Sequence, residues 1–444
     1  MKFMTVSLPE EILREEGAGN FSKAKNMIKQ RLKDDLPAMM KERLRYELER
    51  IDRILKCYGI SEEEARKKLF DSITEFSESE YRRLNEIGAL DCILIEGKRV
   101  YETRFFENLI FLNPEYRKRI KEDEEGKKAK EYLHKRLNEL ISGDRPKKYR
   151  VIAEIRLKPK IEDGKEVRCW LPFPKEEFPI TSVKMLSCSH EEYRVSPNET
   201  PQRTIYMEDT PREDLEFSVR FEYTIQEQIT RVDPEKVLSS EKYEFLKENP
   251  PHIIFTPYIR ELTSEIVGKE KNPYLKAKRI YDWITMNVRY SYMHPYSLYE
   301  NIPQFCASNL RGDCGVQALL FITMCRIAGV PARWQSGWYA NPIRPGPHDW
   351  AVFYVHPYGW LPADLSFGGA RRDIQEYREF YFGNLDAFRM IANSQYMGEI
   401  LPRKKYWRSD PYDNQIGELE TESENIYIDL FKHEINIISF EEIE

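Results

Sequence analysis

The segment 310–339 reads LRGDCGVQALLFITMCRIAGVPARWQSGWY. The turn Gly312-Asp313 precedes an apolar run, Val316–Ala328, which predicts a buried helix with an aspartate as its N-cap. Gly329 follows the run, as glycine commonly does where a helix ends. Cys314 is therefore expected in the first turn of a buried helix.

This position of Cys314 has chemical consequences. Unpaired backbone amides and the helix dipole favour an anion, so a thiol with an ordinary pKa of about 8.5 is expected to shift toward the thiolate. The same amides can stabilise an oxyanion on a substrate carbonyl. Cys314 is the candidate nucleophile, and its own N–H is the default oxyanion donor. Trp283, Tyr290 and Gln304 are side-chain candidates for that second role.

The segment 348–369, HDWAVFYVHPYGWLPADLSFGG, follows a strand expected at 332–339 and predicts two further strands. His348 opens the first of these, beside a loop rich in Pro and Gly, where an imidazole is reachable. Asp364 falls near the end of the second, where a carboxylate can accept the imidazole N–H. Together with Cys314, these residues supply a nucleophile, a base and an orienting acid.

The remaining polar residues of this region receive structural interpretations. Asp349 points away from its neighbour His348 in a strand, so it is not expected to orient the imidazole. His356 precedes a turn and is interpreted as a structural residue. Cys306 and Cys325 are interpreted as core residues.

The combined motifs resemble the transglutaminase-like superfamily, whose members are relatives of the papain-like thiol enzymes. The matching residues are Gly312, Cys314, Ala318, Gly329-Val330-Pro331-Ala332-Arg333, His348-Asp349-Trp350, Gly359-Trp360 and Asp364. The resemblance covers about 231–400. It departs from the family pattern at Asp349, where a small residue is usual, and at Leu365-Ser366, where Pro-Thr is frequent.

The resemblance implies a reaction as well as a fold. The Cys314 thiolate attacks an amide or ester carbonyl, His348 takes and returns the proton, and Asp364 fixes the tautomer of the imidazole. The resulting thioester passes to water or to an amine. We expect hydrolysis of amide bonds in a peptide or protein substrate, with amine transfer to glutamine side chains as the alternative.

A non-catalytic binding module on this fold is a third possibility, against which the intact triad argues. We expect no cofactor and no metal, because the sequence contains no calcium-loop pattern and no Cys/His spacing typical of zinc.

The predicted fold class is α+β, with four parts. Residues 1–145 are densely charged and mostly helical. Residues 146–230 alternate with a period of two, which predicts an antiparallel β-sandwich, and this part resembles the accessory domain upstream of bacterial and archaeal family members. Residues 231–400 form the papain-like, transglutaminase-like core, and residues 401–444 are expected to pack on that core. Capping boxes are predicted at Ser61-Glu62-Glu63-Glu64 and Ser77-Glu78-Ser79-Glu80.

Composition limits the partners of the 444-residue chain. Lys and Arg number 69 against 75 Asp and Glu, a formal net charge of −6, and the two signs are interleaved, which argues against nucleic acid. The apolar stretch Ala318–Cys325 is far shorter than the roughly 18 residues of a membrane span, and no secretory signal opens the sequence. The cysteines number seven, an odd count without zinc spacing, so we expect reduced thiols and a cytoplasmic location.

Overall fold

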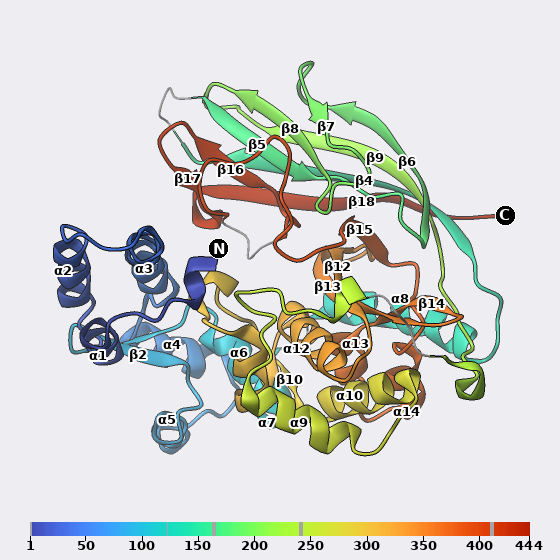
Figure 1. Ribbon diagram of the computed structural model, residues 1–444, viewed down its shortest axis with the longest axis horizontal. Coiled ribbons are helices and arrows are strands. Elements are labelled where there is room, and N and C mark those ends of the chain that lie inside the picture. The colour runs from blue at the N-terminus through green and yellow to red at the C-terminus, as the bar shows by residue number, and fades with distance from the viewer. Residues whose placement is uncertain (1, 122, 162–165, 239–242, 409–412) are drawn as a thin grey trace.

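The computed structural model describes residues 2–121, 123–161, 166–238, 243–408 and 413–444. Figure 1 shows a β-sandwich at the top, an N-terminal helical region at the lower left in blue, and a core of helices and a sheet at the lower right. The order of the parts along the chain agrees with the α+β class predicted from the sequence.

The N-terminal region is helical and contains a small three-stranded sheet of order β1-β3-β2. Both predicted capping boxes are confirmed: the Ser61 side chain accepts from the Glu64 N–H and the Ser77 side chain from the Glu80 N–H, each with the reciprocal bond. The elements are α1 (Glu10–Gly17), α2 (Phe21–Arg31), α3 (Ala38–Cys57), β1 (Ile60–Ser61), α4 (Glu62–Ser72), α5 (Glu78–Glu86), β2 (Cys92–Ile95), β3 (Lys98–Tyr101), α6 (Phe105–Leu112), α7 (Pro114–Arg117) and α8 (Glu124–Ile141).

The sandwich consists of two antiparallel sheets, with orders β18-β4-β9-β6 and β17-β16-β5-β8-β7. Burial along β9 alternates at every residue, as the period of two predicts for a strand with one face in the core. The strands are β4 (Lys148–Pro159), β5 (Val167–Pro172), β6 (Ile180–Cys188), β7 (Arg194–Val195), β8 (Thr204–Asp209), β9 (Phe217–Gln226), β16 (Glu418–Thr421), β17 (Asn425–Ile426) and β18 (Phe431–Ile443).

The C-terminal residues 401–444 were expected on the catalytic core, and most of them lie in the sandwich instead. β18 pairs with β4 and β16 pairs with β5, so this segment adds strands to both sheets. The physical reason is the open edge that β4 and β5 would otherwise present, with unpaired N–H and C=O groups. Among its described residues, Asp413–Gln415, a short stretch before β16, hydrogen-bonds to Ser336, Trp338 and Asp349 of the core.

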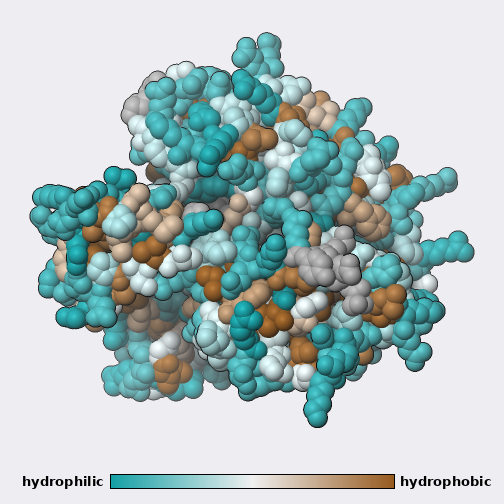
Figure 2. Space-filling view, viewed as in Figure 1, coloured by the Kyte–Doolittle hydropathy of each residue, from teal (hydrophilic) through white to brown (hydrophobic). Residues whose placement is uncertain are grey.

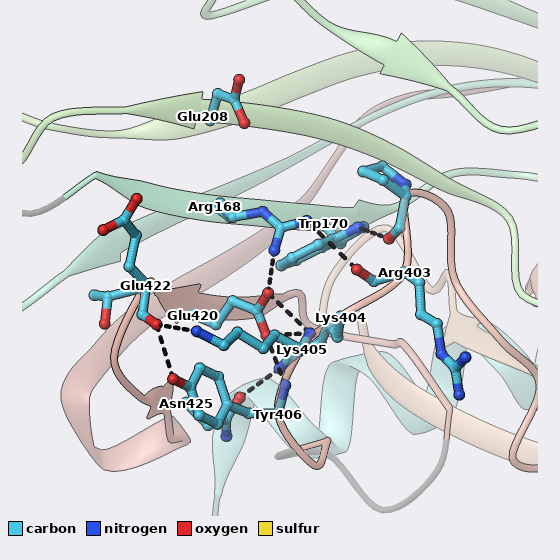
Figure 3. A network of polar contacts seen from close by, with 12 residues as sticks. Arg168, Trp170, Glu208, Arg403, Lys404, Lys405, Tyr406, Glu420, Glu422 and Asn425 are labelled. Carbon is cyan, nitrogen blue, oxygen red and sulfur yellow. Dashed lines mark hydrogen bonds and ion pairs between the residues drawn. The ribbon is translucent and has the colours of Figure 1, made fainter.

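Figure 3 shows how the chain before that stretch is fastened to the sandwich. The Glu420 carboxylate bonds to Arg168 of β5 and accepts the backbone N–H groups of Lys405 and Tyr406 at 3.0 and 3.2 Å. Trp170 Nε1 donates to the Pro402 carbonyl at 2.8 Å. These contacts fix the path of the segment that continues toward Asp413.

The core predicted at 231–400 combines a four-stranded sheet of order β14-β13-β12-β15 with a group of helices. In Figure 1 this sheet lies between the sandwich and helices α10, α12 and α13. The predicted buried helix is confirmed as α12, and the three predicted strands as β12, β13 and β14. The elements are α9 (Pro257–Val267), α10 (Pro273–Asn287), β10 (Arg289–Tyr290), α11 (Ile302–Asn309), β11 (Arg311–Gly312), α12 (Cys314–Ile327), β12 (Ala332–Tyr339), β13 (Gly346–Val355), β14 (Gly359–Ala363), α13 (Leu365–Gly369), α14 (Gln375–Phe380) and β15 (Arg389–Asn393).

The face of the molecule in Figure 2 is mainly hydrophilic, with hydrophobic residues in small separate groups. Across the described part of the chain, no helix has both the length and the apolar character that crossing a membrane requires.

Candidate active site

Cys314 is the first residue of α12. Asp313 is the N-cap, as predicted, and its Oδ1 accepts the N–H of Val316 at 3.0 Å. The helix that follows is buried from Gly315 to Cys325, so its start cannot shift without disturbing the core. Cys314 as a whole residue is half-buried.

Gly315 allows three side chains to close over this first helical turn. A Cβ at this position would lie 2.1 Å from Tyr296 Oη, 2.8 Å from Asp349 Oδ2 and 2.8 Å from the Trp334 ring. Tyr296 Oη also donates to Asp313 Oδ1 at 2.6 Å, which ties the cap to the wall of the site. The absence of a side chain at residue 315 therefore creates the close approach of Asp349 to Cys314.

The thiol of Cys314 donates a hydrogen bond to Asp349 Oδ2 at 3.3 Å. Burial, followed by the negative charges of Asp349 and Asp313, raises the pKa of the Cys314 thiol well above its ordinary value. The helix start was expected to favour the thiolate, but that effect is typically worth only about 0.3–1 kcal/mol. Desolvation and two carboxyl groups outweigh it, and the sulfur in this arrangement is a neutral thiol.

Asp349 belongs to a buried polar cluster. Gln415 Nε2 donates to Asp349 Oδ1 at 2.6 Å and to the His348 carbonyl at 3.0 Å. The Asp349 carboxyl is also hydrogen-bonded to Asp413, whose Oδ2 accepts from Ser336 Oγ. Burial is the largest cause that raises the pKa of both carboxyl groups, and the charge of Asp413 raises that of Asp349 further.

His348 and Asp364 form a close pair on the neighbouring strands. His348 Nε2 lies 2.7 Å from Asp364 Oδ2, and Arg389 Nη2 donates to the same oxygen at 2.8 Å. Burial opposes the charge of Asp364, but the bond and charge of His348, together with the charge of Arg389, hold the pKa of this carboxyl well below its ordinary value. Asp364 is also the N-cap of α13, where its Oδ1 accepts the Phe367 N–H at 3.0 Å.

The structure joins the three predicted site residues in two separate groups. His348 bonds to Asp364, whereas Cys314 bonds to Asp349, and no hydrogen bond links Cys314 to His348 in the portion of the chain that is described. The division follows from strand geometry, because His348 and Asp349 are consecutive on β13 and point to opposite faces. His348 packs against Trp350 of its own face, with ring centroids 5.8 Å apart.

Sequence reasoning missed Asp349, Asp413, Gln415 and Arg389. The alternation along β13 predicted that the side chains of His348 and Asp349 point to opposite faces of the strand. It could not show that the Cys314 thiol bonds to Asp349. Asp413 and Gln415 come from a segment without a recognisable motif. Among the three side chains suggested as oxyanion donors, Tyr290 belongs to β10 and pairs with Gly312, two residues before Cys314, in the parallel β10–β11 bridge.

The loop that carries Tyr296 is held by the N-terminal region. Asn108 of α6 bonds to both backbone groups of Tyr292: its Oδ1 accepts the N–H at 2.7 Å and its Nδ2 donates to the carbonyl at 3.1 Å. Arg104 Nη2 donates to the Met293 carbonyl at 2.6 Å. A region without catalytic residues thus supports one wall of the candidate site.

Replacing Asn108 by alanine is expected to destabilise the protein by about 1–3 kcal/mol, because it leaves the N–H and C=O of Tyr292 without their partners in a largely buried place. Urea unfolding would measure the loss. Asn113 is a matched control, since its side chain bonds only to a carbonyl in its own helix, and the same substitution there should cost clearly less. Equal losses at both positions would contradict a support role for Asn108.

Comparison with known proteins gives a family match over part of the chain. Residues 260–365 match the sequence profile of the Transglutaminase-like superfamily. An uncharacterized protein of Haemophilus influenzae is 23% identical over 274 residues, which cover 52% of this chain and 74% of that protein.

Solved structures give more distant likenesses. A candidate cysteine protease from Cytophaga hutchinsonii has a TM-score of 0.43 and 17% identity, over 67% of this chain and 92% of that one. The periplasmic domain of TgpA from Pseudomonas aeruginosa has a TM-score of 0.28 and 14% identity, over 55% and 96% of the two chains. Likenesses at these scores are too remote to bear on the chemistry of the site.

Proposed function

From the premise that this chain carries a transglutaminase-like superfamily core, we propose that it is a cysteine hydrolase that cleaves amide bonds of peptides or proteins. The single observation that carries the proposal is the buried Asp364–His348 pair on the strands beside a cysteine at a helix start. Because Asp364 engages Nε2, the Nδ1 atom of His348 is the nitrogen left to exchange a proton.

The proposed reaction has two halves. In the first, the Cys314 proton passes to His348, the sulfur bonds to the carbonyl carbon, and the C–N bond breaks as the leaving amine takes the proton. In the second, water attacks the thioester carbon and gives a proton to His348, and the acid leaves as the thiol re-forms. Asp364 keeps the imidazole in the required tautomer and stabilises its protonated form.

The second candidate function is amine transfer, in which a primary amine replaces water in the second half-reaction. The third is a binding module without catalysis. The same core is compatible with both of these functions and with hydrolysis. The products formed from a peptide substrate distinguish the three.

The expected result is turnover of a tryptic peptide library that has been mixed with an isotopically labelled primary amine. Mass spectrometry should find new peptide termini or deamidated glutamines if the enzyme is a hydrolase, and amine-labelled glutamines if it is a transferase. His348→Ala should lower either signal by about 10²–10⁴-fold, because the proton acceptor is lost. A wild-type protein that changes no peptide would favour the binding module, and full activity in the variant would exclude His348 as the base.

We also propose a cytoplasmic location and a peptide or protein partner, without nucleic acid or membrane. All seven cysteines are unpaired, which is typical of a reducing compartment. Cell fractionation followed by immunoblotting would test the location, and recovery outside the cytoplasm would contradict it.

A further inference from the structure

The thiol of Cys314 contacts Asp349, one of two buried carboxyl groups that the proposed reaction does not use. Its Sγ donates to Asp349 Oδ2 at 3.3 Å, and Asp349 is hydrogen-bonded to Asp413. The two aspartates are 6% and 3% exposed. They come from distant parts of the chain, β13 and the segment before β16.

Two carboxyl groups in such contact do not both ionise, because like charges repel strongly where water is excluded. Each carboxyl group also accepts a hydrogen bond from a neutral donor: Gln415 Nε2 donates to Asp349 Oδ1 at 2.6 Å, and Ser336 Oγ donates to Asp413 Oδ2. The pair therefore carries at most one negative charge beside the sulfur.

The other titratable groups near the thiol do not offset this charge. Asp313 adds a carboxyl group, and burial raises its pKa to about 6. Tyr296 is buried and Tyr290 is half-buried, and desolvation raises the pKa of both phenols, so they stay neutral. The positive charges of Arg104 and Arg408 lower the pKa of Asp313 and Asp413 respectively.

We propose that Asp349, supported by Asp413 and Gln415, is a positioning residue that holds Cys314 as a hydrogen-bonded, protonated thiol until substrate enters. The proposal rests on the function proposed above, since it concerns the same nucleophile. His348 and Asp349 are consecutive on β13, so the same strand carries the carboxyl group that holds the thiol and the imidazole that accepts its proton in the proposed reaction. Catalysis begins when the S–H···O bond to Asp349 breaks and the proton passes to the imidazole.

The test is the rate at which iodoacetamide alkylates Cys314, followed by peptide mapping over a range of pH. Asp349→Asn keeps the shape of the side chain and removes its charge. We expect this variant to be alkylated at least about tenfold faster near neutral pH, which corresponds to a fall of about one unit in the pKa of the thiol.

Asp413→Asn is the matched control, because the opposite effect is expected. Without the charge of Asp413, Asp349 no longer shares its proton and becomes a full anion in contact with the sulfur. Alkylation of Cys314 should then be no faster than in the wild type. The half-buried Cys57 and Cys92 serve as internal references whose rates should not change.

Three outcomes would overturn the proposal: no acceleration in Asp349→Asn, equal acceleration in both variants, or parallel acceleration of Cys57 and Cys92. The second would mean an opened site, and the third a loosened fold. Because alkylation needs no substrate, these outcomes are separate from failure of the proposed function, which the peptide library measures. A faster thiol in Asp349→Asn without any peptide turnover in the wild type would support the restraint on Cys314 and exclude the hydrolase.

Discussion

Replacing Cys314 by alanine is expected to lower turnover of a peptide substrate by about 10⁴–10⁶-fold, the range found when a nucleophile that acts together with its base is removed. Without the sulfur no thioester forms, and His348 and Asp364 have no proton to transfer. The fold should survive, because the Asp313 cap and the buried helix behind it do not depend on the thiol. Initial rates measured alongside thermal unfolding would check both statements.

Cys57→Ala is the control for this substitution, since it removes the same group from another half-buried cysteine on α3. It should leave turnover within about a factor of two. If Cys314→Ala kept substantial activity, or if both variants lost it together, Cys314 would not be the nucleophile. The thioester mechanism would then have to be abandoned, although the core would keep its fold.

The largest effect on stability is expected from Arg389→Met. Arg389 is fully buried and donates to Asp364 Oδ2 at 2.8 Å and to Asp386 Oδ1 at 3.0 Å. Methionine leaves both carboxylates buried without their cation, which typically costs about 3–5 kcal/mol. Urea unfolding should show the loss as a lower midpoint.

The loss in Arg389→Met should also depend on pH. The folded-state pKa of Asp364 is depressed, so its favourable contribution exists above the unfolded value of about 3.9 and disappears as pH falls through the folded value. The difference between wild type and variant should therefore be largest at neutral pH and shrink in acid. A difference that grows in acid would contradict the role of Arg389 as counter-ion.

Arg371→Met is the matched control, because both arginines lie over the Phe367 ring, at 4.5 Å for Arg389 and 5.0 Å for Arg371. Arg371 has no carboxylate partner within the described contacts and is only partly buried. We expect a cost of about 1–2 kcal/mol, clearly less than for Arg389→Met, in line with the loss of two hydrogen bonds, to the Phe367 carbonyl and to His134 Nε2.

The sequence was most informative where the signals are local. The apolar run bounded by Asp313 and Gly329 predicted α12 to within two residues, because a cap and a helix-ending glycine act on their own neighbours. The alternation at 348–356 predicted β13 and correctly assigned His348 and Asp349 to opposite faces. These signals needed no information from distant parts of the chain.

The missed features depend on contacts between residues far apart in sequence. Nothing in residues 401–444 indicates that β18 pairs with β4, since any strand of suitable pattern could fill that edge. The same limit applies to the nucleophile. Its bond to Asp349, and the support of Asp349 by Gln415, depend on how the segment before β16 crosses the core.

The pairing of β4 with β18 has a consequence for folding during synthesis, because the two strands lie far apart in the sequence. Arg150 and Glu441, which bond across these strands, are separated by 291 positions. During synthesis, the edge of β4 that pairs with β18 stays unpaired until the core between them has been made. Strands with an unpaired edge tend to associate with other chains. Asp413 and Gln415 belong to the same C-terminal segment. Cys314 is therefore synthesised before the two residues that support its proposed restraint by Asp349.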